Sequence, residues 1–176
     1  MNGTAFTDYA YLTSVSDPDW KIVGIGDFNG DGKVDILWRN LATGQIVVWF
    51  MNGTTLTDYA YLTSVSDPDW KIVGTGDFNE DGNVDLVWRN TATGQNAVWF
   101  MNGTILIGYA YMTSVPDQNW KIVGTGDFNG DGKVDLLWRN VVTGEDAVWF
   151  MNGTAFTGYV CLDAIRDTSW TIGNEQ

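Results

Sequence analysis

Short runs of β-branched and aromatic residues alternate with clusters of Asp, Asn, Gly and Pro along the whole chain. In the first full copy of this pattern the apolar runs cover residues 21–26, 34–39, 45–51 and 55–62, and helical periodicity is absent. Runs of this length, separated by turn-forming residues, predict four short β-strands. The second and third runs are apolar on both faces, so we expect these two strands to be covered on both sides.

The pattern repeats with a period of 50 residues, marked by Met-Asn-Gly-Thr at positions 1, 51, 101 and 151. Four antiparallel strands per repeat predict an all-β fold, a β-propeller of four-stranded blades; a β-solenoid is the alternative, with shorter coils and fewer hairpin turns. We expect one repeat domain over residues 1–176. Its parts are a lone outer strand (1–16), three full blades (17–66, 67–116 and 117–166) and the start of a further blade (167–176).

The stretch between the first and second strands of each repeat is rich in oxygen-bearing side chains. They stand at loop positions 1, 3, 5 and 9, and Gly at position 6 permits a sharp turn. With the backbone carbonyl at position 7, they supply most of the six to eight hard oxygen ligands that Ca²⁺ takes, so we expect about three structural Ca²⁺ ions per chain. The expected ligands are Asp27, Asn29, Asp31, Lys33 and Asp35; Asp77, Asn79, Asp81, Asn83 and Asp85; and Asp127, Asn129, Asp131, Lys133 and Asp135.

Two other interpretations of these loops can be weighed on the residues themselves. An EF-hand has a bidentate Glu at position 12, where these loops have Trp38, Trp88 and Trp138. A plain hairpin turn has no reason to gather three carboxylates, since each pair about 5 Å apart repels by about 3 kcal/mol at an effective dielectric of about 20. The second loop has Glu80 at position 4, which is not a standard ligand position, so we expect Glu80 to be tolerated.

The segment Gly-Asp-Phe-Asn-Gly-Asp-Gly-Lys-Val-Asp, followed by an apolar strand, resembles the FG-GAP (or VCBS) repeat over about residues 17–166. This resemblance implies four-stranded propeller blades with calcium in the loop between the first and second strands. The segments Ile-Leu-Trp-Arg-Asn and Val-Trp-Phe-Met-Asn-Gly also look like bacterial relatives of the Psathyrella velutina lectin. That second resemblance implies a seven-bladed propeller with sugar pockets between its blades.

Hairpin turns alternate between the two ends of a blade, so we expect the calcium loops and Asn-Gly turns at one end. The other end gathers Trp, Arg and Asn, which suit a sugar because an aromatic plane takes its C–H face and planar polar groups take its hydroxyls. Core packing of the Trp side chains, and pairing of Arg39 with Asp17 or Asp19, are the structural alternatives. The candidate ligand-binding residues are Trp20, Trp70, Trp120, Arg39, Arg89, Arg139, Asn40, Asn90 and Asn140.

Composition narrows the classes of function. The formal net charge of −13, from 22 acidic and 9 basic residues, disfavours nucleic acid and anionic membrane surfaces as partners. The chain has no His and a single Cys, Cys161, which excludes His-based catalytic triads, His-ligated zinc and an intrachain disulfide. No run of about 18 apolar residues predicts a membrane-spanning helix, so membrane insertion is not expected.

Three full blades are fewer than the four to eight that propellers use, and open blade edges invite pairing. We therefore expect a homo-oligomer that completes the ring between chains. A seven-bladed dimer, a six-bladed ring with two additional half-blades, a swapped arrangement and a longer protein of which this chain is a fragment are all open alternatives.

The expected function is that of a calcium-stabilised binding module, a multivalent carbohydrate-binding lectin. The alternative is a protein–protein adhesion or scaffold propeller without sugar affinity. Enzyme activity is not expected, because His is absent and the Asp clusters are better used by calcium. Weak calcium sites of this class favour an extracellular or secreted setting, and the resemblances favour a bacterial source, although Met1 opens into the repeat without the features of a signal peptide.

Overall fold

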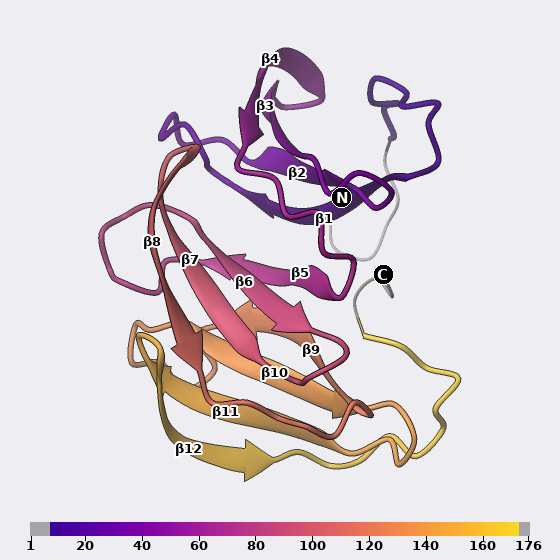
Figure 1. The fold of residues 1–176 in the computed structure, drawn as a ribbon, viewed down its shortest axis with the longest axis vertical. Coiled ribbons are helices and arrows are strands. Elements are labelled where there is room, and N and C mark those ends of the chain that lie inside the picture. Colours follow the sequence, from indigo (N-terminus) through magenta and orange to yellow (C-terminus); the bar gives the residue numbers. More distant parts are fainter. Residues whose placement is uncertain (1–7, 173–176) are drawn as a thin grey trace.

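The computed structural model describes residues 8–172, and this part of the chain contains twelve β-strands and no helix. The strands form three four-stranded antiparallel sheets, each made of four strands consecutive in the sequence. Each sheet corresponds to one 50-residue repeat, which confirms the predicted all-β architecture of propeller-type blades (Figure 1). The three blades follow one another and do not close into a ring.

The strand bounds agree with the predicted runs to within about one residue in the first repeat. Blade 1 contains β1 (Trp20–Gly26), β2 (Asp35–Asn40), β3 (Ile46–Asn52) and β4 (Thr55–Leu62). Blade 2 contains β5 (Trp70–Gly76), β6 (Asp85–Asn90), β7 (Asn96–Asn102) and β8 (Ile105–Met112). Blade 3 contains β9 (Trp120–Gly126), β10 (Asp135–Asn140), β11 (Asp146–Asn152) and β12 (Ala155–Cys161).

The two partial blades expected at the chain ends fall partly outside the described residues. Residues 8–16, from the expected lone outer strand, carry no strand, and residues 1–7 are not described. Residues 167–172, from the expected start of a further blade, form turns and irregular backbone, and residues 173–176 are not described. In the described range, no helix is long and apolar enough to cross a membrane.

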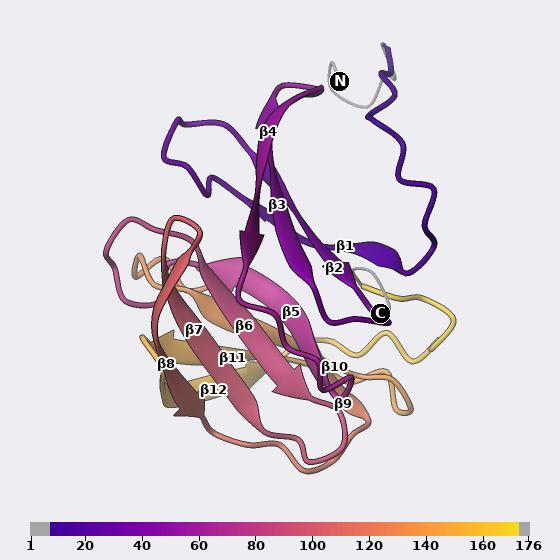
Figure 2. The ribbon, with the colours of Figure 1, turned by 45° about the horizontal axis from the view of Figure 1, so that its top comes forward.

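The first strand of each blade lies on the inner side of the arrangement. Strand β1 contacts β5, and β5 contacts β9, whereas β4, β8 and β12 form the opposite edges of their sheets (Figure 2). A β-bulge interrupts the pairing of the first two strands in blade 1, between Ile22 and Gly24. Bulges increase the local twist of a strand, which suits blades that must fan around an axis.

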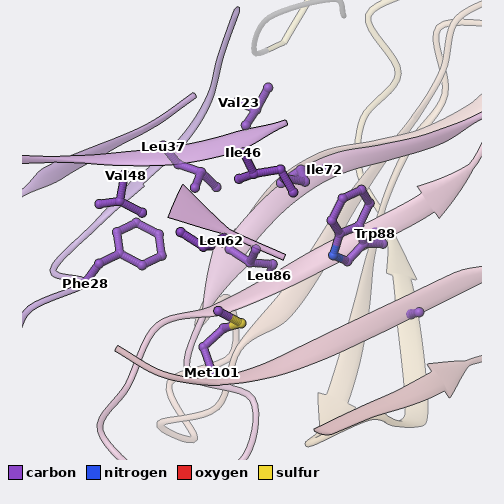
Figure 3. Packing of buried hydrophobic residues seen from close by; sticks show 11 residues of the cluster. Val23, Phe28, Leu37, Ile46, Val48, Leu62, Ile72, Leu86, Trp88 and Met101 are labelled. Atoms are coloured by element: carbon purple, nitrogen blue, oxygen red, sulfur yellow. The ribbon is translucent and has the colours of Figure 1, made fainter. Parts of the chain in front are cut away.

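The hydrophobic core lies between blades, not inside any one of them. We call the face that a blade turns to the following blade its trailing face, and the opposite one its leading face. The trailing face of blade 1 includes Val23, Phe28, Leu37, Val48 and Leu62, and the leading face of blade 2 includes Ile72, Leu86, Trp88, Ala97 and Met101 (Figure 3). Blades 2 and 3 pack through equivalent positions, with Phe78, Val87 and Val98 against Ile122, Leu136 and Trp138. Each blade is therefore stabilised by its neighbours, as in other repeat proteins.

Candidate functional site

The loop that follows the first strand of each blade is held by hydrogen bonds from its own backbone to its acidic side chains. In blade 1, Asp27 Oδ1 accepts from the Gly30 and Asp31 amides at 2.8 and 3.1 Å, and Asp27 Oδ2 accepts from the Gly32 amide at 2.7 Å. Asn29 Oδ1 also accepts from the Asp31 amide at 3.0 Å. The same pattern recurs around Asp127 in blade 3. The backbone amides hold the pKa of Asp127 below its usual range, with the Gly132 amide contributing most.

The Asp at loop position 9 has a different environment, because Asp35, Asp85 and Asp135 are fully buried. Asp85 Oδ2 accepts from the Phe78 amide and Oδ1 from the Met101 amide, both at 2.9 Å, and so joins the start of the loop to β7. Burial raises the pKa of Asp85 despite these two donors, and the negative charges of Asp81 and Asp77 raise the pKa further. The loop carboxylates are therefore close enough to disfavour one another's ionisation.

The carboxylates are held by backbone donors and do not meet at one point. Within residues 8–172, no group of three His, Cys, Asp or Glu side chains is close enough to hold a metal as it stands. The donor set nevertheless fits a hard cation, because each loop offers carboxylate, amide and carbonyl oxygens, and an oxygen such as Asp27 Oδ2, which accepts one hydrogen bond, keeps a second lone pair. Calcium binding at these loops stays a prediction.

The end of the blades that holds the Asp-rich loops also holds the Asn-Gly turns, as the alternation of hairpin turns predicts. Asn83 Oδ1 in the second loop accepts from the amide of Gly103, at 3.3 Å. Lys133 in the third loop donates to Asn152 Oδ1, and its Nζ lies 3.9 Å from the carboxylate of Glu80. Glu80 is the one non-glycine residue with positive φ in the described range, at 60°, where Gly30 and Gly130 have 74° and 80°. Loop position 4 thus requires a left-handed backbone that the sequence analysis did not anticipate.

The Arg side chains predicted at the opposite end are buried and bind the linkers between blades. Arg39 donates to the carbonyl of Trp70, to that of Val65 at 2.9 Å and to that of Asp67 at 3.3 Å. The alternative pairing of Arg39 with Asp17 or Asp19 is wrong, because Asp17 instead accepts from Asn40 Nδ2 at 3.2 Å. Each of the first two Arg side chains also lies over a Trp of the next blade: Arg39 over Trp88 and Arg89 over Trp138, both at 5.1 Å from the ring centre.

The remaining candidate ligand residues also have structural contacts. Asn40, Asn90 and Asn140 are buried, and each Oδ1 caps the turn that follows, as Asn90 does by accepting from the amides of Ala92 and Thr93 at 3.0 and 2.9 Å. Trp20, Trp70 and Trp120 are half-buried at the start of their blades. The structure thus brings the Arg and Trp candidates together around the linkers. Their role in binding a ligand stays a prediction.

An aromatic cavity of about 300 Å³ lies against blade 2 and includes one of the predicted residues, Trp70. Tyr109 and Tyr111 on β8 also line it, and Trp70 and Tyr111 have ring centres 6.4 Å apart. Neither Tyr was among the ligand-binding residues predicted from the sequence. The available signal was the spacing of two Tyr at i and i+2 on the outer strand, which places both on one face of that strand. The cavity is completed by Val65, Trp88, Ala97, Trp99 and Leu106.

A larger cavity of about 650 Å³ lies along the inner strands β1, β5 and β9. Its walls include Ile22, Ile72 and Ile122, and its charged lining residues are Lys71, Lys121, Arg89 and Arg139. Burial lowers the pKa of Lys121, and the charge of Arg89 lowers the pKa further. The space between the inner strands is therefore positively charged in a protein that is acidic as a whole.

Comparisons with known proteins agree with the loop motif. The model of the family described as FG-GAP-like repeat matches the chain twice, over residues 27–88 and 77–138. Each match runs from the first Asp of one loop to the Trp that follows the next loop, so the family pattern covers both the loops and the strands between them. No curated protein matches the chain significantly. Because the two matches together span more than half of the residues, the chain belongs to the family of FG-GAP-like repeat proteins.

Proposed function

We propose that this chain is a calcium-stabilised, propeller-type binding module with a carbohydrate as its ligand and no catalytic activity. The proposal of a carbohydrate ligand rests on the aromatic cavity of blade 2, where Trp70, Tyr109 and Tyr111 line a space of about 300 Å³. That volume is at the lower end of small-molecule sites, which suits one or two sugar rings. Flat aromatic rings present an apolar surface to the C–H face of a sugar, and the Tyr hydroxyls remain available for hydrogen bonds.

Trp88 also lines this cavity. Its indole Nε1 is buried and has no hydrogen-bond acceptor among the described residues, as is also the case for Trp38 and Trp138. The same donor is unpartnered in all three blades, so it is not specific to this cavity. Nearby Arg and Asn side chains support the cavity indirectly, since Arg39 holds the linker that carries Val65.

The proposed calcium ions belong to the opposite end of the blades and have a structural role. In blade 2 one ion would be held by Asp77, Asn79, Asp81 and Asp85 with the carbonyl of Asn83. The equivalent residues would hold one ion each in blades 1 and 3. Bound calcium supplies the positive charge that offsets repulsion among these carboxylates. The pKa of Asp85 is raised mainly by burial, and the negative charges of Asp81 and Asp77 raise it further; a bound cation would offset this second contribution.

A glycan array with the calcium-loaded chain tests the proposed function, and Tyr109→Ala with Tyr159→Ala forms a matched pair. The two Tyr occupy the same repeat position and are 63% and 64% exposed, but only Tyr109 lines the cavity. In blade 3 the counterpart of Tyr111 is Cys161, and Phe156 packs on Trp149 with ring centres 4.7 Å apart. We expect Tyr109→Ala to weaken sugar binding about fivefold, since an aromatic contact contributes about 1 kcal/mol, and Tyr159→Ala to have no effect.

The outcomes of this experiment separate the two proposed functions. Selective glycan binding that survives mild EDTA treatment supports a lectin with structural calcium. If a folded, calcium-loaded chain binds no glycan, the carbohydrate proposal is refuted, and an adhesion or scaffold role becomes the leading hypothesis. Equal effects of the two Tyr substitutions would mean that the sugar does not bind in the cavity of blade 2.

A further inference from the structure

The repeats provide an internal standard for judging which surfaces lack a neighbour. Each position occurs in three blades, so a residue that is buried in two blades and exposed in the third identifies a missing contact. On the trailing face, Phe28 and Phe78 are 2% and 3% exposed, but Phe128 of blade 3 is 47% exposed. Leu62 and Met112 are each 6% exposed, whereas the equivalent Leu162 is 44% exposed.

The leading face of blade 1 shows the complementary difference. Ile72 and Ile122 are 0% and 5% exposed, but Ile22 is 38% exposed. Trp88 and Trp138 are each 1% exposed, whereas the equivalent Trp38 is only half-buried. Val34 is 59% exposed, and its counterparts Val84 and Val134 are half-buried. The arrangement of three blades thus leaves one trailing and one leading face uncovered, both apolar.

We propose that these two faces bind each other between chains, so that the trailing face of blade 3 packs on the leading face of blade 1 of a second copy. The two faces are made of the same repeat positions that pack together twice within the chain. Continuity with those internal interfaces is what identifies the occupant as a second copy. Such head-to-tail contact is heterologous, and two chains joined at both junctions form a closed ring of six blades, within the range of four to eight that propellers use.

The internal interfaces specify the register of this junction. Val84 Cγ1 lies 2.9 Å from the position that a Cβ on Gly26 would occupy, and Val134 stands in the same relation to Gly76. The same register places Val34 of the second copy against Gly126. The carbonyl of Phe28 lies 3.2 Å from the Cβ position of Gly103, while the Cβ position of Gly53 has no atom within 4 Å.

Two further features affect the strength of the junction: an Arg–Trp contact that adds to it, and a missing Thr hydroxyl that weakens it. Arg39 and Arg89 lie over Trp88 and Trp138, so the same register places Arg139 over Trp38 of the second copy. At the inner strands, the Thr75 hydroxyl donates to the Ile25 carbonyl at 2.8 Å, and the Thr125 hydroxyl donates to the Thr75 carbonyl at 2.7 Å. The first blade has Ile25 at that position and lacks the hydroxyl. We therefore expect the junction between chains to be weaker than the internal ones and to depend on concentration.

Sedimentation equilibrium of the whole chain over a range of concentrations tests this proposal. We expect reversible formation of a dimer. Phe128→Asp on the trailing face and Val34→Asp on the leading face should each lower the association constant more than about tenfold, because each places a carboxylate in an apolar contact. Ile107→Asp is the control, since Ile107 is 57% exposed on β8 of the middle blade, which belongs to neither end face. Leu162→Asp and Ile22→Asp replace the first two variants if either fails to give the far-ultraviolet spectrum of the folded chain.

Mixing the two variants distinguishes head-to-tail contact from contact between identical faces. In a mixture of Phe128→Asp and Val34→Asp chains, the intact trailing face of one meets the intact leading face of the other, so we expect a dimer joined at one junction. A chain that stays monomeric at about 100 μM overturns the proposal. It is equally overturned if only one variant reduces association, if neither does, or if the mixture fails to associate while the wild type pairs.

Discussion

Replacing equivalent Phe residues in different blades tests how much of the stability comes from contact between neighbouring blades. Phe78 in blade 2 packs against blade 3 and is only 3% exposed, whereas Phe128, at the same repeat position in blade 3, is 47% exposed. The two residues occupy position 2 of equivalent loops, after the first strand of each blade. A difference between Phe78→Ala and Phe128→Ala therefore reports the neighbouring blade and not the local backbone.

The exposures give the expected size of that difference. Truncating a fully buried Phe costs about 3–5 kcal/mol, which includes the cavity left behind. Phe128 loses about half of that transfer free energy and leaves an open depression instead of a closed cavity, so we expect about 1–2 kcal/mol. The difference of about 2 kcal/mol corresponds to about 4–8 °C in Tm for a chain of this length.

Thermal unfolding in dilute solution, where the chain is monomeric by sedimentation, measures this difference. Phe28→Ala serves as a second buried control, since Phe28 is 2% exposed. Equal shifts in Tm for Phe78→Ala and Phe128→Ala under these conditions would refute the reasoning, because they would mean that the trailing face of blade 3 is covered within a single chain. At concentrations where chains pair, the cost of Phe128→Ala should approach that of Phe78→Ala.

Three other predictions follow from the loops and turns. Glu80→Gly should stabilise the chain by about 0.5–1 kcal/mol in chemical denaturation, because Glu80 has φ of 60°, and Gly30→Glu should destabilise it; the same sign for both would contradict the strain argument. Gly94→Ala should cost about 3 kcal/mol or more, since its Cβ would lie 2.1 Å from the Val115 oxygen, while Gly82→Ala, with open space around it, should cost only about 1–2 kcal/mol. Without calcium, the folded chain holds the proton of Asp85 more tightly than the unfolded chain does, because the pKa of Asp85 is raised above 3.8. This group therefore stabilises the folded state at low pH, and the stabilisation is lost as the pH rises through the raised pKa. The pKa of Asp81 is lowered, mainly by a hydrogen bond from the Asn83 side chain, so its contribution to stability is lost only as the pH falls below 3.8. The gain in Tm on adding calcium should therefore grow as the pH rises above about 4, and a gain independent of pH would contradict this assignment.

Much of the fold follows from the sequence because each strand and turn is specified locally and then repeated. Asn-Gly at 52–53 and the Asp-rich loop at 27–35 contain the residue types that such turns require, and the structure has strands on both sides of each. The apolar character of the second and third strands on both faces predicts coverage on both sides, and in the middle blade Leu86 and Val87, on opposite faces of β6, are both fully buried. Local pattern and tertiary packing agree in these elements, as expected for a chain with a well-defined fold.

The sequence was a poorer guide where the outcome depends on contacts between blades. Charge alone suggested an Asp partner for Arg39, but the linker carbonyls and the Trp of the next blade lie closer once the blades are packed. The positive φ of Glu80 could not be inferred from ligand positions, since that residue is fixed by the turn and not by the proposed cation. The aromatic cavity likewise depends on how β8 is placed beside Trp70 and the Val65 linker.

Calorimetric titration of the chain with calcium, combined with thermal unfolding, tests whether the Asp-rich loops bind calcium. We expect about three ions per chain, with Kd values of about 10⁻⁴–10⁻³ M and a Tm that rises with calcium concentration. Asp31→Asn, Asp81→Asn and Asp131→Asn should each remove one ion, because each changes a single loop. A folded chain that takes up no calcium at several times these concentrations, and whose Tm does not change, would contradict the account.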